Sequence, residues 1–235
     1  MTIYAFDLDG TLTPPRLPMT QEFAQSFLPW LKNNKAFIAT GSDINKVKEQ
    51  LSPEVIKAFA GIYCSMGNDL WKDGDYLYRH DFTPEPELLK DLKTLRQNTK
   101  YPFQLFDNFI EKRTGMLNFS ILGRNCPYAE RERYYAWDNQ HHERENTQII
   151  LSKKYPQYDF VLGGTISMDI IKKGCGKGQI AHHLRQSFPQ EKIIFFGDKT
   201  FPGGNDYELA HTLQEMKNTQ VIQVDTPQEV LDTLL

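Results

Sequence analysis

Residues Ile3-Tyr4-Ala5-Phe6, followed by Asp7-Leu8-Asp9-Gly10-Thr11, form the stretch that decides the fold. The apolar run predicts a buried strand, and Gly10 permits a sharp turn directly after it. In open α/β sheets, ligands bind outside the carboxyl ends of the strands. Asp7 and Asp9 lie at such an end. There one carboxylate can attack an electrophile, the other can carry a proton, and both offer oxygen ligands to Mg2+. The competing interpretation is a solvated acidic turn.

The pattern of a strand, a polar turn and a helix recurs toward both ends of the chain. The apolar runs 36–39 and 193–196 end in the turns Thr40-Gly41-Ser42-Asp43 and Gly197-Asp198. Strands that alternate with helices predict a parallel sheet. Thr40 or Ser42 can donate a hydroxyl to a phosphoryl oxygen, although Ser42 can equally be a simple helix cap. We therefore predict an α/β fold with a Rossmann-like parallel-sheet core.

The middle of the chain has a different pattern. Leucines at 88, 89, 92 and 95 have helical spacing, whereas residues 115–122 alternate between apolar and polar side chains. Such alternation is typical of an antiparallel sheet with one covered and one open face. We predict an inserted α+β cap domain, an antiparallel sheet with helices, at residues 81–171. The core domain would then contain residues 1–80 and 172–235.

Composition limits the function classes. The 235 residues carry a formal net charge of -3, with 40% hydrophobic and 24% charged residues, which is ordinary for a globular protein. There is no clustered basic excess, no apolar run of membrane-spanning length and no secretory signal, so we expect no nucleic-acid and no membrane partner. The three scattered cysteines fit free thiols in a cytoplasmic protein.

Further residues complete a candidate site for phosphoryl transfer. Asp198 with Asn205-Asp206 would add carboxylates, of which Mg2+ needs about two or three. Lys177, just before a predicted helix, can balance the charge that develops during transfer, although a solvated turn lysine is the simpler interpretation. Arg16 lies among prolines that would hold it near the two acids, a useful position for contacting phosphate.

These residues resemble the motifs of the haloacid dehalogenase superfamily, in the branch whose α+β cap lies between the second and third motifs. More specifically, the chain resembles the eukaryotic-type α-phosphomannomutase family over nearly its whole length. Ordinary cap-bearing sugar phosphatases lack the Pro-Pro-Arg extension and the long final loop. The matching stretches are residues 7–16, 41–43, 109–111, 113, 115–118, 120, 123–124, 131, 163–169 and 195–206.

The resemblance implies an activity and a mechanism. Mannose 6-phosphate and mannose 1-phosphate would interconvert through an aspartyl phosphate and a hexose 1,6-bisphosphate, which also serves as activator. Asp7 would be the nucleophile, Asp9 the general acid/base and Lys177 the balancing cation. Mg2+ would be held by Asp7, the backbone carbonyl of Asp9 and Asp198. The partner would be a small hexose phosphate, and related mutases form homodimers through their caps.

The resemblance also assigns binding residues. Cap arginines would hold the distal phosphate of the substrate, and polar side chains would contact the sugar hydroxyls. The substrate contacts would be Arg16, Arg113, Arg124, Arg131, Ser167 and Asp169. Thr40 and Ser42 would contact phosphate, and Asn205 and Asp206 would support the metal ligands.

Two departures from the family keep alternatives open. Where the family usually has an acid for a second cation site, this chain has Thr212, so the sequence does not predict that site. Ala39-Thr40-Gly41 is more similar to the sugar phosphatases, so a Mg2+-dependent sugar-phosphate phosphatase is the alternative activity. A non-catalytic sugar-phosphate-binding protein is a third interpretation, against which the intact set of acids and Lys177 argues.

Overall fold

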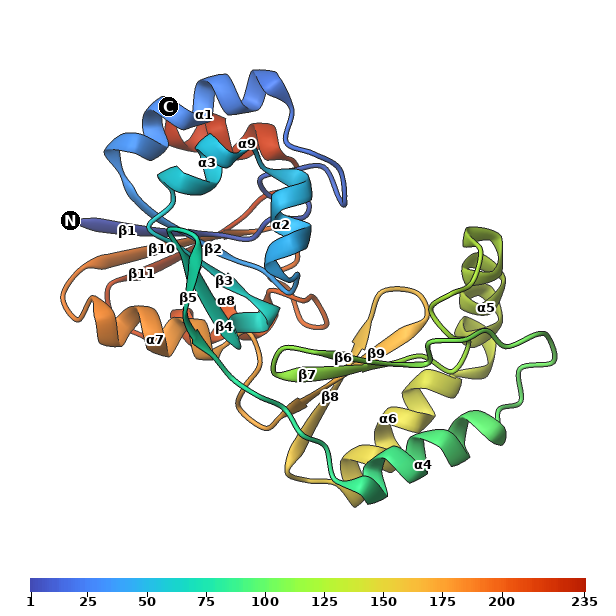
Figure 1. The fold of residues 1–235 in the computed structure, drawn as a ribbon. Coiled ribbons are helices and arrows are strands. Elements are labelled where there is room, and N and C mark those ends of the chain that lie inside the picture. Colours follow the sequence, from blue (N-terminus) through green and yellow to red (C-terminus); the bar gives the residue numbers. More distant parts are fainter. The chain divides into compact units, whose positions relative to one another are not determined.

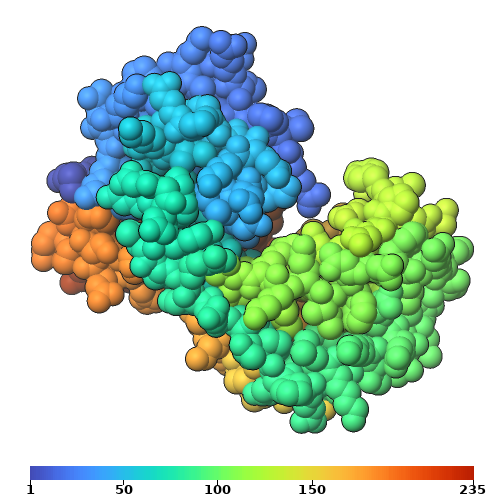
Figure 2. Space-filling view, viewed as in Figure 1, coloured from blue at the N-terminus to red at the C-terminus, as the bar shows by residue number.

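The computed structural model describes residues 1–235, which divide into two compact units (Figure 1). The core unit contains residues 1–80 and 175–235, and the inserted unit contains residues 81–174. Figure 2 shows that segments from both ends of the chain, coloured blue to teal and orange, contribute to the core unit. Strand β9 (Ser167–Lys172) stays paired in the inserted sheet to its last residue, two residues before the second boundary between the units.

The core unit is built on a seven-stranded sheet with the strand order β11-β10-β1-β2-β3-β4-β5. The first five strands in this order are parallel, and β4 and β5 add an antiparallel hairpin at one edge. Strand β1 therefore lies inside the sheet, and its carboxyl end leads directly to Asp7. The bounds are β1 Thr2–Phe6, β2 Lys35–Ala39, β3 Gly61–Cys64, β4 Asp69–Lys72, β5 Asp75–Arg79, β10 Lys192–Gly197 and β11 Thr219–Gln223.

Helices cover both faces of this sheet (Figure 1). Helices α1, α2, α3 and α9 share a hydrophobic cluster with Phe6 of β1, whereas α7 and α8 pack with Ile3 and Ala5 of the same strand. Burial on both faces explains why β1 is a continuous apolar run rather than an alternating one. The bounds are α1 Gln21–Asn33, α2 Ile44–Gln50, α3 Pro53–Ala58, the 3-10 turn η1 Ser65–Gly67, α7 Gln179–Ser187, α8 Tyr207–Gln214 and α9 Pro227–Leu234.

The inserted unit is an antiparallel four-stranded sheet with helices, as predicted, with the strand order β6-β7-β9-β8. Leu117 and Phe119 of β7 belong to the hydrophobic cluster that the helices cover. Asn118, between them, lies on the opposite face, in register with Glu111 of β6 and Asp169 of β9. The bounds are α4 Pro86–Gln97, β6 Ile110–Arg113, β7 Met116–Phe119, α5 Tyr128–His141, α6 Glu143–Lys154 and β8 Tyr158–Gly163.

None of the helices combines the length and the apolar content that crossing a membrane requires.

Candidate active site

Lys177 is a buried cation of the core unit that contacts two carboxylates. It is 2% exposed, and its Nζ lies 2.6 Å from Asp7 Oδ1 and 2.5 Å from Asp206 Oδ1. Burial lowers the pKa of Lys177, but the charges of Asp206 and Asp7 together outweigh burial and raise it overall. Burial raises the pKa of Asp7, against the opposing effect of Lys177. The structure therefore brings together two residues that the sequence analysis proposed for one site.

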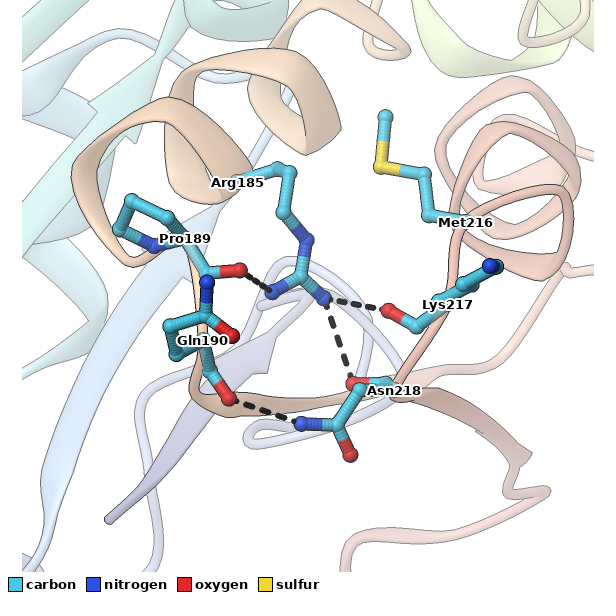
Figure 3. A pocket seen from close by; sticks show the side chains of 6 residues that line it. All are labelled: Arg185, Pro189, Gln190, Met216, Lys217 and Asn218. Atoms are coloured by element: carbon cyan, nitrogen blue, oxygen red, sulfur yellow. Dashed lines mark hydrogen bonds between the residues drawn. The ribbon is translucent and has the colours of Figure 1, made fainter.

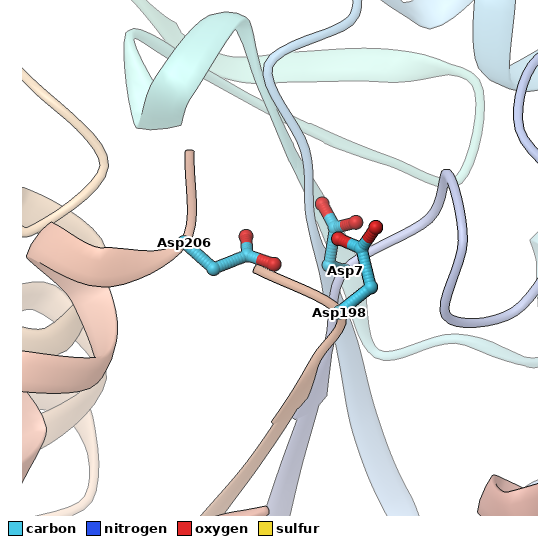
Figure 4. A group of neighbouring side chains, drawn as sticks. All are labelled: Asp7, Asp198 and Asp206. Carbon is cyan, nitrogen blue, oxygen red and sulfur yellow. The ribbon is translucent and has the colours of Figure 1, made fainter. Parts of the chain in front are cut away.

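Three carboxylates meet at the carboxyl end of β1 and β10 (Figure 4). Asp7, Asp198 and Asp206 each offer one oxygen, and these oxygens lie within 4.8 Å of one another. Asp7 Oδ2 and Asp198 Oδ1 are buried without a hydrogen-bond partner. Because a buried carboxylate oxygen needs a partner, and because Mg2+ prefers carboxylate oxygens, this group fits a hard divalent cation. The sequence analysis gave Asp206 only a supporting place, whereas the structure places it beside Asp7 and Lys177.

Gly10 allows Asp198 to approach the turn after β1. Its φ is +91°, and a Cβ built on it would lie 2.5 Å from Asp198 Oδ2. The other contact of that oxygen is with Lys199, whose Nζ donates to it at 2.6 Å. Asp198 is thus held through one oxygen, while its other oxygen is buried without a hydrogen-bond partner.

The Asp9 side chain points to different partners. Its Oδ1 accepts from the backbone N–H of Arg16 at 2.6 Å and from Gln50 Nε2 at 2.8 Å. Gln50 also donates to Thr13 Oγ1 at 3.1 Å, so it links α2 to the turn after β1. Asp9 lies outside the group of three clustered carboxylates. Arg16 is exposed, with its backbone at a φ of 61°, and sequence reasoning missed Gln50.

The turn after β2 carries Thr40 and Ser42. Thr40 is buried, and its Oγ1 accepts from the backbone N–H of Ser42 at 3.1 Å. Asp43, not Ser42, caps α2, because its side chain accepts from Asn45 N and Lys46 N. The alternative of Ser42 as a simple cap is therefore wrong, and its hydroxyl is half-buried at the carboxyl end of a core strand.

The open face of the inserted sheet carries a second group of charged residues. Arg113 and Arg124 both contact Glu111, and Arg113 Nη1 lies 3.9 Å from Asp169 Oδ1. Arg131 Nη2 donates to the backbone carbonyl of Arg124 at 2.8 Å. Burial, followed by the charge of Arg113, lowers the pKa of Arg124. Three of the predicted arginines thus gather in one unit with Asp169.

Two predicted residues stand apart from these contacts. Ser167 Oγ donates to the carbonyl of Gly163 at 3.0 Å, in the turn before β9, and Asn205 is exposed in the loop before α8.

Burial raises the pKa of Asp169, while the hydrogen bond from Asn118 opposes that rise. Asn118 and Glu111 were not named as site residues from the sequence.

A surface pocket of about 360 Å³ in the core unit is lined by Arg185, Pro189, Gln190 and Met216–Asn218 (Figure 3). Its arginine does not offer a free anion site. The guanidinium donates to the backbone carbonyls of Phe188, Pro189, Glu191, Lys217 and Asn218. Arg185 therefore ties the loop after α7 to the segment before β11.

The parallel α/β core, interrupted by an α+β unit, has a haloacid dehalogenase-like fold, and it carries an aspartate, a buried lysine and a group of carboxylates. The fold matches a haloacid dehalogenase-like hydrolase from Bacteroides thetaiotaomicron, with a TM-score of 0.63 and 11% identity over 99% of this chain and 98% of that one. It also matches the IMP-nucleotidase of Plasmodium falciparum, with a TM-score of 0.64 and 16% identity over 100% of this chain and 68% of that one.

Sequence comparison defines the family within this class. Residues 25–235 match the family described as eukaryotic phosphomannomutase. Phosphomannomutase 1 of Dictyostelium discoideum is 38% identical over 89% of this chain and 87% of its own length. The phosphomannomutase of Saccharomyces cerevisiae is 34% identical over 88% of this chain and 84% of its own. The chain belongs to the eukaryotic phosphomannomutase family.

Proposed function

We propose that this chain is a phosphomannomutase that interconverts mannose 6-phosphate and mannose 1-phosphate through an aspartyl phosphate on Asp7. One observation carries the proposal. In a chain of this family, Asp7 is buried at the carboxyl end of β1, with one oxygen paired to Lys177 and the other without a partner. A carboxylate held in this way is suited to nucleophilic catalysis, because the contact with Lys177 fixes its orientation at the edge of the sheet.

The residues fit Mg2+ as cofactor. The unpartnered oxygens of Asp7 and Asp198, with the backbone carbonyl of Asp9, would hold the ion. Bound there, Mg2+ would stabilise negative charge on the transferred phosphoryl group. Lys177 supplies a fixed positive charge next to the same carboxylate, and Asp206 keeps that lysine in place from its other side.

The protein's own residues account for the bonds that form and break. A carboxylate oxygen of Asp7 attacks the phosphorus of a hexose 1,6-bisphosphate, the bond from phosphorus to the sugar oxygen breaks, and Asp9 gives that oxygen a proton. In the return step, mannose 1-phosphate has replaced the first product, and Asp9 takes a proton from its free 6-hydroxyl. That hydroxyl attacks the phosphorus of the aspartyl phosphate, the bond from phosphorus to the Asp7 oxygen breaks, and Asp7 is regenerated. The mannose 1,6-bisphosphate so formed then gives its other phosphoryl group to Asp7 and leaves as mannose 6-phosphate. The aspartyl phosphate is thereby restored, so a catalytic amount of the bisphosphate acts as activator.

The substrate's remaining groups require additional contacts. We assign the phosphate that is not being transferred to Arg113, Arg124 and Arg131, because guanidinium groups bind phosphate through paired hydrogen bonds. Asp169 and Ser167 would contact sugar hydroxyls, and Thr40, Ser42 and Arg16 would contact the transferred phosphate. The contacts of Arg113 and Arg124 with Glu111, and of Arg131 with the backbone of Arg124, support this assignment.

A coupled assay tests the proposal. Purified protein is given mannose 1-phosphate and Mg2+, with and without glucose 1,6-bisphosphate, and both mannose 6-phosphate and inorganic phosphate are measured. We expect mannose 6-phosphate to form and to depend on the bisphosphate, and Asp7→Asn to abolish it. Release of inorganic phosphate without isomerisation would instead identify the alternative, a sugar-phosphate phosphatase.

We further propose a cytoplasmic location and a homodimer formed through the inserted unit. Light scattering during gel filtration would test the second point, with a mass near twice 27.3 kDa expected.

A further inference from the structure

One carboxylate oxygen of the inserted unit joins two arginines. Glu111 Oε2 accepts from Arg113 Nη2 at 2.5 Å and from Arg113 Nε at 3.0 Å, and it lies 3.0 Å from Arg124 Nε. The two guanidinium groups, which would otherwise repel each other, are therefore held by a shared acceptor. Both guanidinium groups make this contact through Nε, and Arg113 also through Nη2.

Asn118 continues the same network on the neighbouring strand. Its Oδ1 accepts from Arg124 Nη1 at 2.8 Å, and its Nδ2 donates to Asp169 Oδ1 at 2.6 Å. Asn118 is 2% exposed. Register explains the continuity, because Glu111, Asn118 and Asp169 are direct cross-strand partners on β6, β7 and β9. Because the buried Asn118 amide is hydrogen-bonded to Arg124 on one side and to Asp169 on the other, it fixes the positions of both side chains.

These contacts leave other donors unused. Arg124 Nη2 and Arg131 Nη1 donate no hydrogen bond within the protein. Arg113, Arg124 and Arg131 are linked to one another or to the two acids Glu111 and Asp169, so this group of residues carries excess positive charge. Groups that are already ordered lose little conformational entropy when an anion binds, and preorganisation of this kind increases affinity.

We propose that Glu111 and Asn118 are positioning residues, which hold Arg113 and Arg124 in a preformed arrangement for the phosphate of a hexose phosphate. The inference rests on the proposed function for the identity of that ligand. The competing explanation is that Glu111 only neutralises the arginines. The two explanations predict effects of opposite sign, because removal of a negative charge from a cationic site should by itself strengthen anion binding.

The test is isothermal titration of the full chain with mannose 1-phosphate, comparing the wild type with Glu111→Gln. We expect about tenfold weaker binding, equivalent to the loss of one charge-assisted hydrogen bond. Glu132→Gln is the matched control, because it removes an exposed carboxylate from the same unit and should change affinity little. Unchanged or tighter binding by Glu111→Gln would overturn the inference.

Two further variants separate positioning from folding and from charge. Glu111→Asp keeps the charge but shortens the reach, so it should also weaken binding, whereas charge neutralisation alone predicts wild-type affinity. In an Arg113→Ala, Arg124→Ala background, Glu111→Gln should have no further effect, because its action runs through those side chains. An additive loss in that background would contradict the inference. Absence of mutase turnover in a wild type that binds mannose 1-phosphate would contradict the proposed function alone.

Discussion

Lys177 separates two buried carboxylates that would otherwise face each other. Its side chain is 3% exposed, and those of Asp7 and Asp206 are 2% and 0% exposed. Removing one partner of a buried ion pair leaves uncompensated charge, which typically costs about 3–5 kcal/mol. We expect Lys177→Met to lower the free energy of unfolding by that amount, measured by urea denaturation without added metal.

Lys199→Met is the matched control for this change. The ammonium group of Lys199 is paired with a single carboxylate, Asp198, and the side chain is 50% exposed, so its loss should cost about 1 kcal/mol or less. Equal losses of unfolding free energy in the two lysine variants would show that burial of the Lys177 ion pairs adds nothing to stability.

Gly10 combines a left-handed backbone with a close neighbour, so we expect Gly10→Ala to impair metal binding as well as stability. A left-handed φ costs a residue with a Cβ about 1–2 kcal/mol, and the Asp198 carboxylate must also move away. Titration calorimetry with Mg2+ would measure the loss of metal binding.

Gly74→Ala is the control: its φ is +97° with nothing within 4 Å of the added Cβ, so it should lose stability but keep Mg2+ affinity. Equal Mg2+ affinity in both variants would contradict the proposed role of Asp198.

Many residues of the site could be predicted from the sequence, but the side chains that contact them often could not. Asp7, Asp198 and Lys177 stand at recognisable strand and helix ends. Gln50 lies near the apolar stripe of α2, where a polar side chain signals a buried contact, yet its partner Asp9 is 41 residues away. Glu111 lies in a stretch that matches the family, but only the register of the inserted sheet and the side-chain contacts show which residues it holds.

At the scale of elements, the site assembles because parallel strands end at the same edge. Phe6 of β1 pairs with Phe196 of β10, so the polar residues that follow these strands come together. The meeting of these polar residues could be predicted from the two apolar runs. The contacts that support the turn after β2 could not be predicted in this way, because they come from η1. There Ser65 and Met66, which are not glycines, adopt positive φ. Their backbone N–H groups donate to the carbonyls of Ser42 and Thr40.

The packing of α7 against β3 includes a titratable contact. His183 Nδ1 lies 2.6 Å from the hydroxyl of Tyr63, which is 1% exposed. Burial, together with the nearby charge of His80, lowers the pKa of His183. Below the usual histidine pKa of about 6.5, the unfolded chain therefore binds more protons than the folded chain at this position. The stability that neutral His183 contributes is therefore complete above that pH and declines as the pH falls.

We therefore expect His183→Gln to flatten the pH dependence of unfolding between about pH 5 and 7 relative to the wild type. Thermal unfolding at a series of pH values would measure the slope. His182→Gln, one residue away and exposed, should leave the slope of the wild type unchanged. If His182→Gln flattened the slope and His183→Gln did not, the Tyr63 contact would have no part in it.

The whole molecule consists of one continuous unit inserted into one discontinuous unit, and this topology predicts different behaviour for fragments. Residues 81–174 contain all four strands of their sheet and a separate hydrophobic cluster. A unit with its own core can fold alone. Residues 1–80 lack β10, which pairs with β1 along its full length, and α7 and α8, which cover one face of the sheet.

We accordingly expect residues 81–174, expressed alone, to give a cooperative thermal transition by circular dichroism and dispersed amide resonances. Residues 1–80 are the control and should show neither, because an unpaired edge and an uncovered sheet face leave apolar surface in water. A non-cooperative 81–174 fragment would mean that its hydrophobic cluster does not suffice and that the core unit must fold first. A cooperative fragment would mean that the arginines around Glu111 are ordered by their own unit, so their anion binding can be measured apart from the chemistry at Asp7.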